Sequence, residues 1–273
     1  MTNFFLYFLT WYFAATPVTN QNVTTLAANN ARNNKSTNFL VVLDAGHGGN
    51  QSGARGVCGA YEKDVVLNIV LELNKLLMAS GRVRTKLTRN KDIRLSLEER
   101  VQIANHEKAN LFISVHANAA PGVTSHGVET FFVSQRASDK RIAKLALIEN
   151  EGRRDFTTAE NTLGLILDSL RLHAAHTESQ RFAALVQQSV CSRLKQPNRG
   201  VLQAPFYVLR FVNMASVLVE VGFLSNPSEC LRLNTPNYQR KIAQALAAAI
   251  LTHVFTTEDT KLASIMTKND SQK

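Results

Sequence analysis

VVLDAGHGGN, residues 41–50, is the most informative stretch of this 273-residue chain. An apolar run from Val41 to Leu43 ends on an acid, Asp44, and three glycines then surround a single histidine, His47. The run is typical of a buried strand, and the glycine loop places His47 just beyond the strand's carboxyl end. In open α/β sheets this edge is where ligands bind, so His47 is the first candidate functional residue.

Apolar runs and helical periodicity continue on both sides of this stretch. Gly81 follows a helical pattern as a stop signal, and Ser96 with Glu99 predicts a capping box at another helix start. Strands are expected at 39–44, 83–88, 111–115, 128–133 and 216–221, and helices at 64–80, 96–105, 138–150, 160–174, 178–195 and 237–254. This alternation predicts an α/β fold: a central mixed, mostly parallel sheet flanked by helices on both faces, in a single domain over 38–256.

Composition narrows the class of protein. Hydrophobic residues make up 45% of the chain and charged residues 19%, which is typical of a globular protein. Lys and Arg number 31 and Asp and Glu 21, so the formal net charge is +10, which suits a polyanionic partner such as an acidic lipid or an anionic wall polymer. The basic residues are scattered and no zinc finger or RNA-binding aromatic motif occurs, so we expect no nucleic-acid partner.

The chain has three cysteines, Cys58, Cys191 and Cys230. An odd number without CxxC spacing argues against a disulfide framework and against a cysteine-zinc site. We therefore expect small buried or half-buried thiols at these positions.

The two ends of the chain differ from its middle. An apolar run from Phe4 to Ala15 is shorter than the roughly 20 residues that a membrane span needs. It resembles the core of a secretory signal, although residues 1–3 carry no Lys or Arg, so an export signal and a remnant of an upstream domain both stay open. We expect a leader or linker at 1–37 and a polar tail at 257–273.

Two further residues share the placement of His47 at element ends. His116 follows the predicted strand 111–115, and Glu62 precedes the predicted helix 64–80. Two imidazoles and one carboxylate are a ligand set for a catalytic zinc ion, which keeps its fourth position open. Taken singly, each residue could instead be a hydrogen-bonded loop residue or a charge at a helix start.

A carboxylate also interrupts the apolar run VLVEVGF, residues 217–223, at Glu220. Such runs are typical of strands covered on both faces, where an unpaired ionised carboxylate costs several kcal/mol. A cation beside Glu220 would offset that cost, and a carboxylate next to a metal ion can accept the proton of an attacking water. The alternative is a strand-end glutamate that faces solvent.

Four blocks occur together in one order: VLDAGHGG (42–49), EKD (62–64), SVHAN (114–118) and VEVGFLSN (219–226). They resemble the zinc-dependent N-acetylmuramoyl-L-alanine amidases of bacterial cell division, the Amidase_3 type, over residues 38–256. The pattern Arg89…Asp92 and Leu97…Arg100…Asn105 is similar to that family as well. Val221 stands where many relatives carry Thr.

The resemblance implies a peptidoglycan hydrolase that cleaves the amide bond between N-acetylmuramic acid and the L-alanine of the stem peptide. It implies that His47, Glu62 and His116 hold Zn2+ and that Glu220 is catalytic. Asn118 is a candidate oxyanion donor. Glu129 is a strand acid that either orders the site or lies on the surface.

The resemblance extends to the segment between the predicted strand ending at 133 and the helix starting at 178, a helical insertion at about 138–177. In Gram-negative division amidases such an insertion covers the zinc cleft and is displaced by an activator protein of the LytM/EnvC/NlpD type. Glu149 aligns with the inhibitory glutamate, with Glu151 as the alternative. A plain packing helix is the other interpretation of this segment.

The resemblance also implies a periplasmic protein that acts in daughter-cell separation. We expect this protein to be a monomer. Two other functions stay open. One is a non-catalytic peptidoglycan-binding or regulatory module of the same fold, although such a module has little need for Glu220. The other is a zinc peptidase or deacetylase that acts on wall material.

Overall fold

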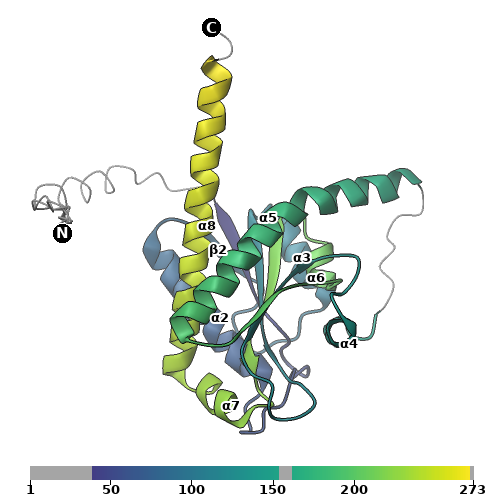
Figure 1. Cartoon of the computed structure of the whole chain (residues 1–273), viewed down its shortest axis with the longest axis vertical. Helices are drawn as coiled ribbons and strands as arrows, with labels where there is room; N and C mark the ends of the chain where they lie inside the picture. The colour runs from purple at the N-terminus through teal and green to yellow at the C-terminus, as the bar shows by residue number, and fades with distance from the viewer. Residues whose placement is uncertain (1–38, 154–161, 271–273) are drawn as a thin grey trace, which may run out of the picture. The chain divides into compact units, whose positions relative to one another are not determined.

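The computed structural model describes residues 39–153 and 162–270, with side chains described over 39–153 and 175–257. The predicted leader lies outside the described residues. The elements follow the order β1 (Leu40–Ala45), α2 (Glu62–Ser80), β2 (Arg84–Leu87), α3 (Leu97–His106), β3 (Leu111–Asn118), β4 (Val128–Val133), α4 (Lys140–Glu149), α5 (Thr162–Leu194), β5 (Asn198–Ala204), α6 (Tyr207–Arg210), β6 (Ala215–Phe223), α7 (Pro227–Leu233) and α8 (Pro236–Asp270) (Figure 1).

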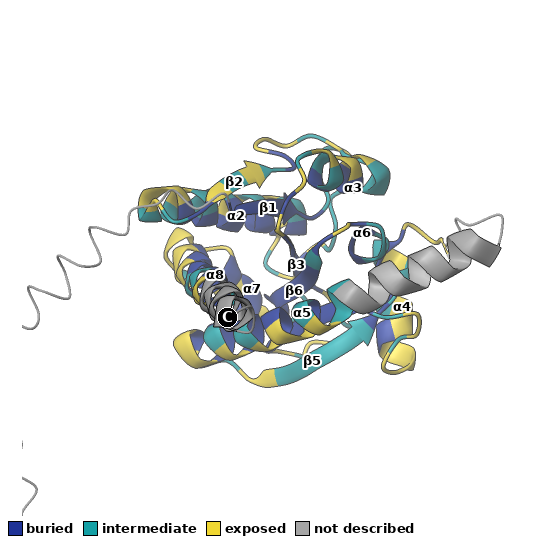
Figure 2. Cartoon of the chain, turned by 90° about the horizontal axis from the view of Figure 1, so that it is seen from above, coloured by how far each residue is buried: buried dark blue, intermediate teal, exposed yellow. Residues whose placement is uncertain are grey.

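The six strands form one mixed sheet in the order β2-β1-β3-β6-β4-β5. All neighbouring strands are parallel except β4 and β6, which are antiparallel. The predicted fold class is therefore confirmed. The central strands β1, β3 and β6 are buried along almost their whole length, whereas the edge strand β5 is mostly half-buried (Figure 2).

Each face of the sheet is covered by its own set of helices. Helices α2, α5 and α8 pack on one face, over side chains such as Val217 and Val219 of β6. Helix α4 and the segment of α6 lie over the other face, which carries Leu218 of the same strand. Side chains alternate along a strand, so Glu220 points to the same face as Leu218, toward α4.

Several predicted boundaries were wrong. The helices expected at 160–174 and 178–195 are one continuous helix, α5, because no Gly or Pro interrupts the chain between them. Helix α8 continues past its predicted end at 254 to Asp270. Strand β5 and the short helices α6 and α7 were not predicted. None of the described helices combines the length and apolar character that a membrane crossing requires.

The prediction of free thiols was wrong for two of the three cysteines. Cys58, in the loop before α2, forms a disulfide with Cys230 of α7, across a sequence separation of 172 residues. Cys191 is a buried free thiol. Counting cysteines failed because an odd total leaves room for one pair and one buried thiol, and sequence spacing carries no information about a pairing this distant.

Candidate metal centre

His47 lies in the glycine loop just after β1, where the sequence placed it. Buried Arg100 holds this loop: its guanidinium donates to the Asp44 carboxylate at 2.6 Å, to the Ala45 carbonyl at 2.7 Å and to the His47 carbonyl at 2.7 Å. Burial raises the pKa of Asp44, but Arg100 and the hydroxyls of Thr88 and Ser114 outweigh it, and the pKa is lowered overall. The backbone of His47 is thus fixed by a buried ion pair.

Two glycines allow the candidate ligands to approach one another. A Cβ on Gly46 would lie 2.4 Å from the His116 ring. A Cβ on Gly53 would lie 2.5 Å from Glu62 Oε2 and 2.6 Å from the His47 ring. Because real Cβ atoms do not come this close to other atoms, the tight packing of these side chains requires glycine at both positions.

Glu62 is the first residue of α2 and is buried. Its Oε2 accepts from the Ala54 N–H at 2.8 Å, and its Oε1 accepts from the Ala117 N–H at 3.0 Å. Oε1 also lies 3.0 Å from His116 Nδ1. These contacts join the loop before α2 to the end of β3 and aim the carboxylate at the two histidines.

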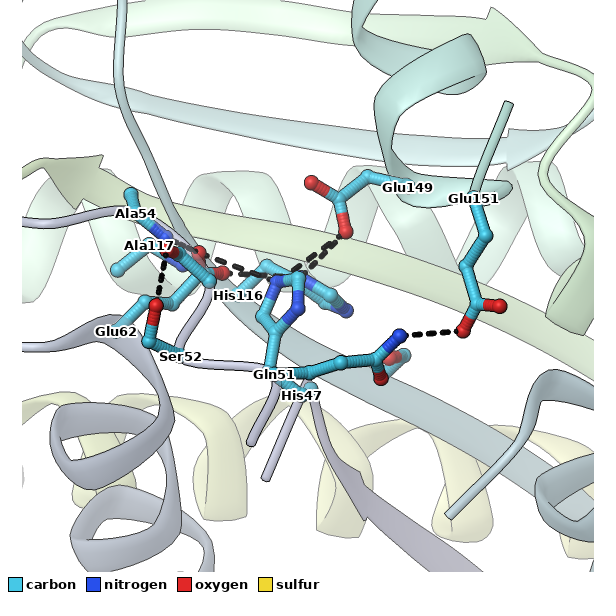
Figure 3. Close-up of polar contacts among 12 residues, drawn as sticks. His47, Gln51, Ser52, Ala54, Glu62, His116, Ala117, Glu149 and Glu151 are labelled. Carbon is cyan, nitrogen blue, oxygen red and sulfur yellow. Dashed lines mark hydrogen bonds and ion pairs between the residues drawn. The ribbon is translucent and has the colours of Figure 1, made fainter. Parts of the chain in front are cut away.

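The nitrogens of His47 and His116 converge with the Glu149 carboxylate (Figure 3). Glu149 Oε2 lies 3.4 Å from His47 Nε2 and 3.2 Å from His116 Nδ1. These three groups offer ligand atoms within 4.8 Å of one another. Glu62 approaches each histidine with a different oxygen, at 3.2 Å from His47 Nε2 and 3.0 Å from His116 Nδ1.

These donors fit a zinc ion. Two ligand atoms at ordinary zinc distances, about 2.0–2.2 Å, lie roughly 3.3–3.6 Å apart in a tetrahedral site, close to the separations seen here. His47 Nε2 and Glu149 Oε2 are both buried and make no hydrogen bond. Their close approach is therefore not explained by a hydrogen bond between them. Nitrogen and carboxylate donors that face a common centre in this way are typical of a metal site.

The charges agree with a cation site. Burial lowers the pKa of His47, but the carboxylates of Glu62 and Glu149 outweigh it and raise that pKa to about 11. Burial raises the pKa of Glu62, but His47 and His116 hold it well below its usual range. The carboxylates of Glu62 and Glu149 therefore favour a positive charge between them. A protonated His47 would supply that charge, and a divalent cation would supply it as well.

Glu220 lies next to this centre, on β6. It is in register with His116 of β3, so both side chains point to the same face of the sheet. Its Oε2 is buried without a hydrogen-bond partner. Burial, with the nearby charges of Glu62 and Glu149, raises the pKa of Glu220 well above its usual value.

Glu129 of β4 lies opposite Glu220 and is fully buried. Arg141 of α4 pairs with it through two nitrogens, at 2.9 and 3.1 Å, and Arg199 of β5 donates to it at 2.8 Å. Asn118, the candidate oxyanion donor, turns its amide toward Glu129 at 3.4 Å. The surface interpretation of Glu129 was wrong. The two arginines were missed, although a strand acid that needs a counter-charge was the available signal.

The two glutamates at the end of α4 point in different directions. Both glutamates line a cavity of about 330 Å3, which His47 and His116 also line, but only Glu149 Oε2 lies within 3.4 Å of the histidine nitrogens. Glu151 accepts from the Gln51 amide at 2.7 Å and lies 3.9 Å from Arg94, away from the histidines. Of the two, Glu149 is the one that belongs to the candidate metal-binding group.

Comparisons with known proteins agree with this geometry. A family described as N-acetylmuramoyl-L-alanine amidase, Amidase_3, matches residues 41–252. AmiC of Escherichia coli O6:H1 is 33% identical over 224 residues, which are 78% of this chain and 52% of AmiC. AmiA of E. coli K12 is 32% identical over 220 residues, which are 78% of this chain and 75% of AmiA.

A solved structure of the CwlD amidase from Clostridioides difficile, in complex with the GerS lipoprotein, matches with a TM-score of 0.61 at 28% identity. The match covers 80% of this chain and all of the CwlD chain. The present chain spans about half the length of AmiC, 52%. With the family match over most of the domain, the sheet and the histidine–glutamate centre, the chain belongs to the N-acetylmuramoyl-L-alanine amidase family.

Proposed function

We propose that this chain is a zinc-dependent N-acetylmuramoyl-L-alanine amidase, which cleaves the bond between the lactyl group of N-acetylmuramic acid and the L-alanine of the stem peptide. The convergence of His47, His116 and two carboxylates on one buried centre carries the proposal. His47, Glu62 and His116 are the proposed zinc ligands. Family membership supports the substrate class.

When bound, zinc would supply a Lewis acid for the carbonyl and would acidify a water molecule. Glu220 is the proposed proton acceptor from that water and the proton donor to the leaving amine. It faces the same side of the sheet as His116, and its Oε2 is free of hydrogen bonds.

The same centre supports autoinhibition by α4. Glu149 Oε2 lies within 3.4 Å of both histidine nitrogens, where a fourth ligand would bind. In this position the carboxylate would exclude the attacking water and the substrate carbonyl. Helix α4 would have to move away before hydrolysis, and an activator that binds the displaced state more tightly would drive that movement.

We also propose that the protein is exported, acts in the periplasm and takes part in daughter-cell separation with an activator of the LytM/EnvC/NlpD type. The Cys58–Cys230 disulfide supports an oxidising compartment. The complex of the CwlD amidase with a lipoprotein supports the proposal of a protein partner.

The test combines metal analysis with digestion of purified peptidoglycan. We expect one equivalent of zinc and a mass spectrum with free stem peptides and intact glycan strands. Autoinhibition predicts that the wild type hydrolyses peptidoglycan slowly without an activator. Glu149→Ala is therefore assayed beside it and should hydrolyse peptidoglycan faster. Cleavage at another bond would point to a peptidase or deacetylase, and zinc binding without release of peptide from either protein would point to a non-catalytic module.

Glu220→Gln separates catalysis from metal binding. The glutamine amide has nearly the same shape as the carboxylate but cannot accept the proton. In the Glu149→Ala background, Glu220→Gln should therefore keep zinc while the rate of hydrolysis falls roughly 10²–10⁴-fold. His47→Ala is the complementary variant, which should lose zinc. Turnover close to that of the Glu149→Ala parent would refute the role of Glu220.

A further inference from the structure

One buried guanidinium joins the two chain segments that carry His47 and Glu62. Arg89 lies between β2 and α3 and is 2% exposed. Its Nη2 donates to the Gly46 carbonyl and to the Lys63 carbonyl, both at 2.8 Å. Gly46 directly precedes His47, and Lys63 directly follows Glu62. A single nitrogen therefore connects the backbones beside two proposed zinc ligands.

The rest of the guanidinium fixes its orientation. Nε donates to the Ala45 carbonyl at 2.9 Å, and Nη1 donates to the Lys91 carbonyl at 3.3 Å. All four acceptors are backbone carbonyls, and the planar fork of arginine can reach them together. Because these four hydrogen bonds all go to backbone carbonyls and none to a proposed ligand side chain, the effect of Arg89 on the centre passes through the backbone.

We propose that Arg89 is a positioning residue that sets the spacing between His47 and Glu62 for zinc binding. This inference rests on the proposed function, in which both residues are zinc ligands. His47 belongs to the loop after β1 and Glu62 to the first turn of α2, so no shared element fixes their separation. Backbone hydrogen bonds from Glu62 N–H to the Ala54 carbonyl and from Lys63 N–H to the Ser52 carbonyl tie α2 to the later part of the loop. The bridge through Arg89 supplies the constraint at the residue next to His47.

A second, more exposed link joins the same two segments. Lys63 Nζ donates to the Gly49 carbonyl at 2.9 Å and to Asp92 Oδ2 at 2.6 Å, while Asp92 Oδ1 accepts from the Gly49 N–H at 2.7 Å. Both links use the segment between β2 and α3 as their base. Lys63 gives the proposal a variant that does not disturb the buried guanidinium.

Arg100 is the matched control. It is also a buried arginine that donates to the His47 loop, at the Ala45 and His47 carbonyls. The structure gives it no hydrogen bond to the start of α2. Changing Arg100 should therefore disturb the His47 loop and its buried partner Asp44 without involving Glu62, whereas changing Arg89 should disturb the relation of His47 to Glu62.

The experiment measures zinc affinity by competition with a chelating indicator, in the full chain, for Arg89→Lys and Arg100→Lys. Each is made in the wild type and in a Glu62→Ala background. A lysine keeps the charge but cannot reach the acceptors of the fork, and loss of such supporting contacts typically lowers metal affinity about 10–100-fold. Far-ultraviolet circular dichroism and melting of the zinc-free proteins report folding.

We expect Arg89→Lys to weaken zinc binding about 10–100-fold in the wild type but less than about threefold when Glu62 is already alanine. Arg100→Lys should weaken binding by the same factor in both backgrounds. An equal effect of Arg89→Lys in both backgrounds, or none in the wild type, would overturn the positioning role.

If Arg89→Lys does not fold, Lys63→Met takes its place. This variant should weaken zinc binding by a smaller factor than Arg89→Lys, and again less in the Glu62→Ala background than in the wild type. Unchanged zinc affinity in folded Lys63→Met then counts against the proposal. A wild-type chain that binds no zinc would refute the proposed function itself, and this inference with it. Zinc binding that is equal in the wild type and Arg89→Lys refutes the positioning role alone.

Discussion

Gly53 and Gly59 lie in the same loop before α2, and both have a left-handed backbone, with φ of +65° and +86°. Of the two, only Gly53 lies against the candidate metal centre, because a Cβ there would overlap Glu62 and His47, whereas a Cβ on Gly59 meets nothing within 4 Å. The pair therefore separates the cost of backbone strain from the cost of displacing the ligands.

We predict that Gly53→Ala lowers zinc affinity by about 10–100-fold, as expected when ligand positions shift. Gly59→Ala should leave zinc affinity unchanged, while both variants lose about 1–2 kcal/mol of stability to the left-handed backbone. Chelator competition and urea unfolding measure the two effects. Equal zinc affinity in the two variants would show that the glycine at 53 serves only the backbone.

The Asp44–Arg100 pair gives a prediction that depends on pH. Asp44→Asn leaves buried Arg100 without its counter-charge, which should cost about 3–5 kcal/mol near neutral pH. The folded-state pKa of Asp44 is lowered, so its contribution is complete above the unfolded value of about 3.9 and is lost as the pH falls through the folded value.

Urea unfolding of the wild type and Asp44→Asn at several pH values tests this directly. The difference in unfolding free energy should stay constant from about pH 7 to pH 5 and shrink below about pH 4. A difference that does not change over the acidic range would mean that Asp44 acts only through its hydrogen bonds.

At the scale of elements, α4 is held to the sheet by charge as well as by packing. Ile142 and Ala146 are its buried side chains, and Arg141 pairs with Glu129 beneath it. At the other end of the helix, Asn150 donates to the Pro205 carbonyl at 2.8 Å and accepts from the Tyr207 N–H at 2.8 Å. Movement of α4 must break these contacts.

We predict that Arg141→Ala loosens α4, because Glu129 stays buried with one cation fewer, at a cost on the order of 1–3 kcal/mol. Hydrogen exchange in α4 should become about tenfold faster or more, and basal peptidoglycan hydrolysis should rise. Lys144→Ala removes a positive charge from an exposed position of the same helix and is the control. Equal exchange rates in the two variants would contradict the idea that Arg141 holds α4.

The elements with a strong pattern could be predicted from the sequence. The apolar run at 128–133 and the capping box at Ser96 predicted β4 and α3 because local burial and local hydrogen bonds decide them. Strand β5 was missed because NRGVLQA has little apolar character and lies at the sheet edge. A strand of this kind is fixed by its partner β4, which a local pattern cannot reveal.

The candidate site was predictable in its residues and less so in its contacts. The pattern placed His47 after a strand, Glu62 at a helix start and Glu220 inside an apolar strand, as the structure has them, whereas His116 lies within β3 and not just beyond its end. The orientation of Asn118 toward Glu129, and the arginines that compensate that acid, depend on which strands become neighbours. Since β4 is antiparallel to β6, Glu129 lies opposite Glu220, and this pairing cannot be read from the spacing of the two residues.

For the whole molecule, the disulfide links the loop before α2 to α7. We predict that Cys58→Ser or chemical reduction lowers the unfolding free energy by about 2–5 kcal/mol, mainly because the unfolded chain gains freedom. Cys191→Ala removes the buried free thiol but keeps the disulfide, so this control should lose as much stability on reduction as the wild type does. Denaturant unfolding with and without reductant measures this, and equal stability in both conditions would contradict a stabilising bond.

The disulfide also closes residues 58–230 into a covalent ring that contains Glu62, His116, Glu149 and Glu220, while His47 precedes it. A protease that cuts one peptide bond inside this ring produces no separate fragment, because the sulfur bridge keeps both pieces in one molecule. Glu62, His116, Glu149 and Glu220 would therefore stay in one covalent molecule after such a cut. Such nicked protein would migrate as one band on a gel before reduction and as two bands after it.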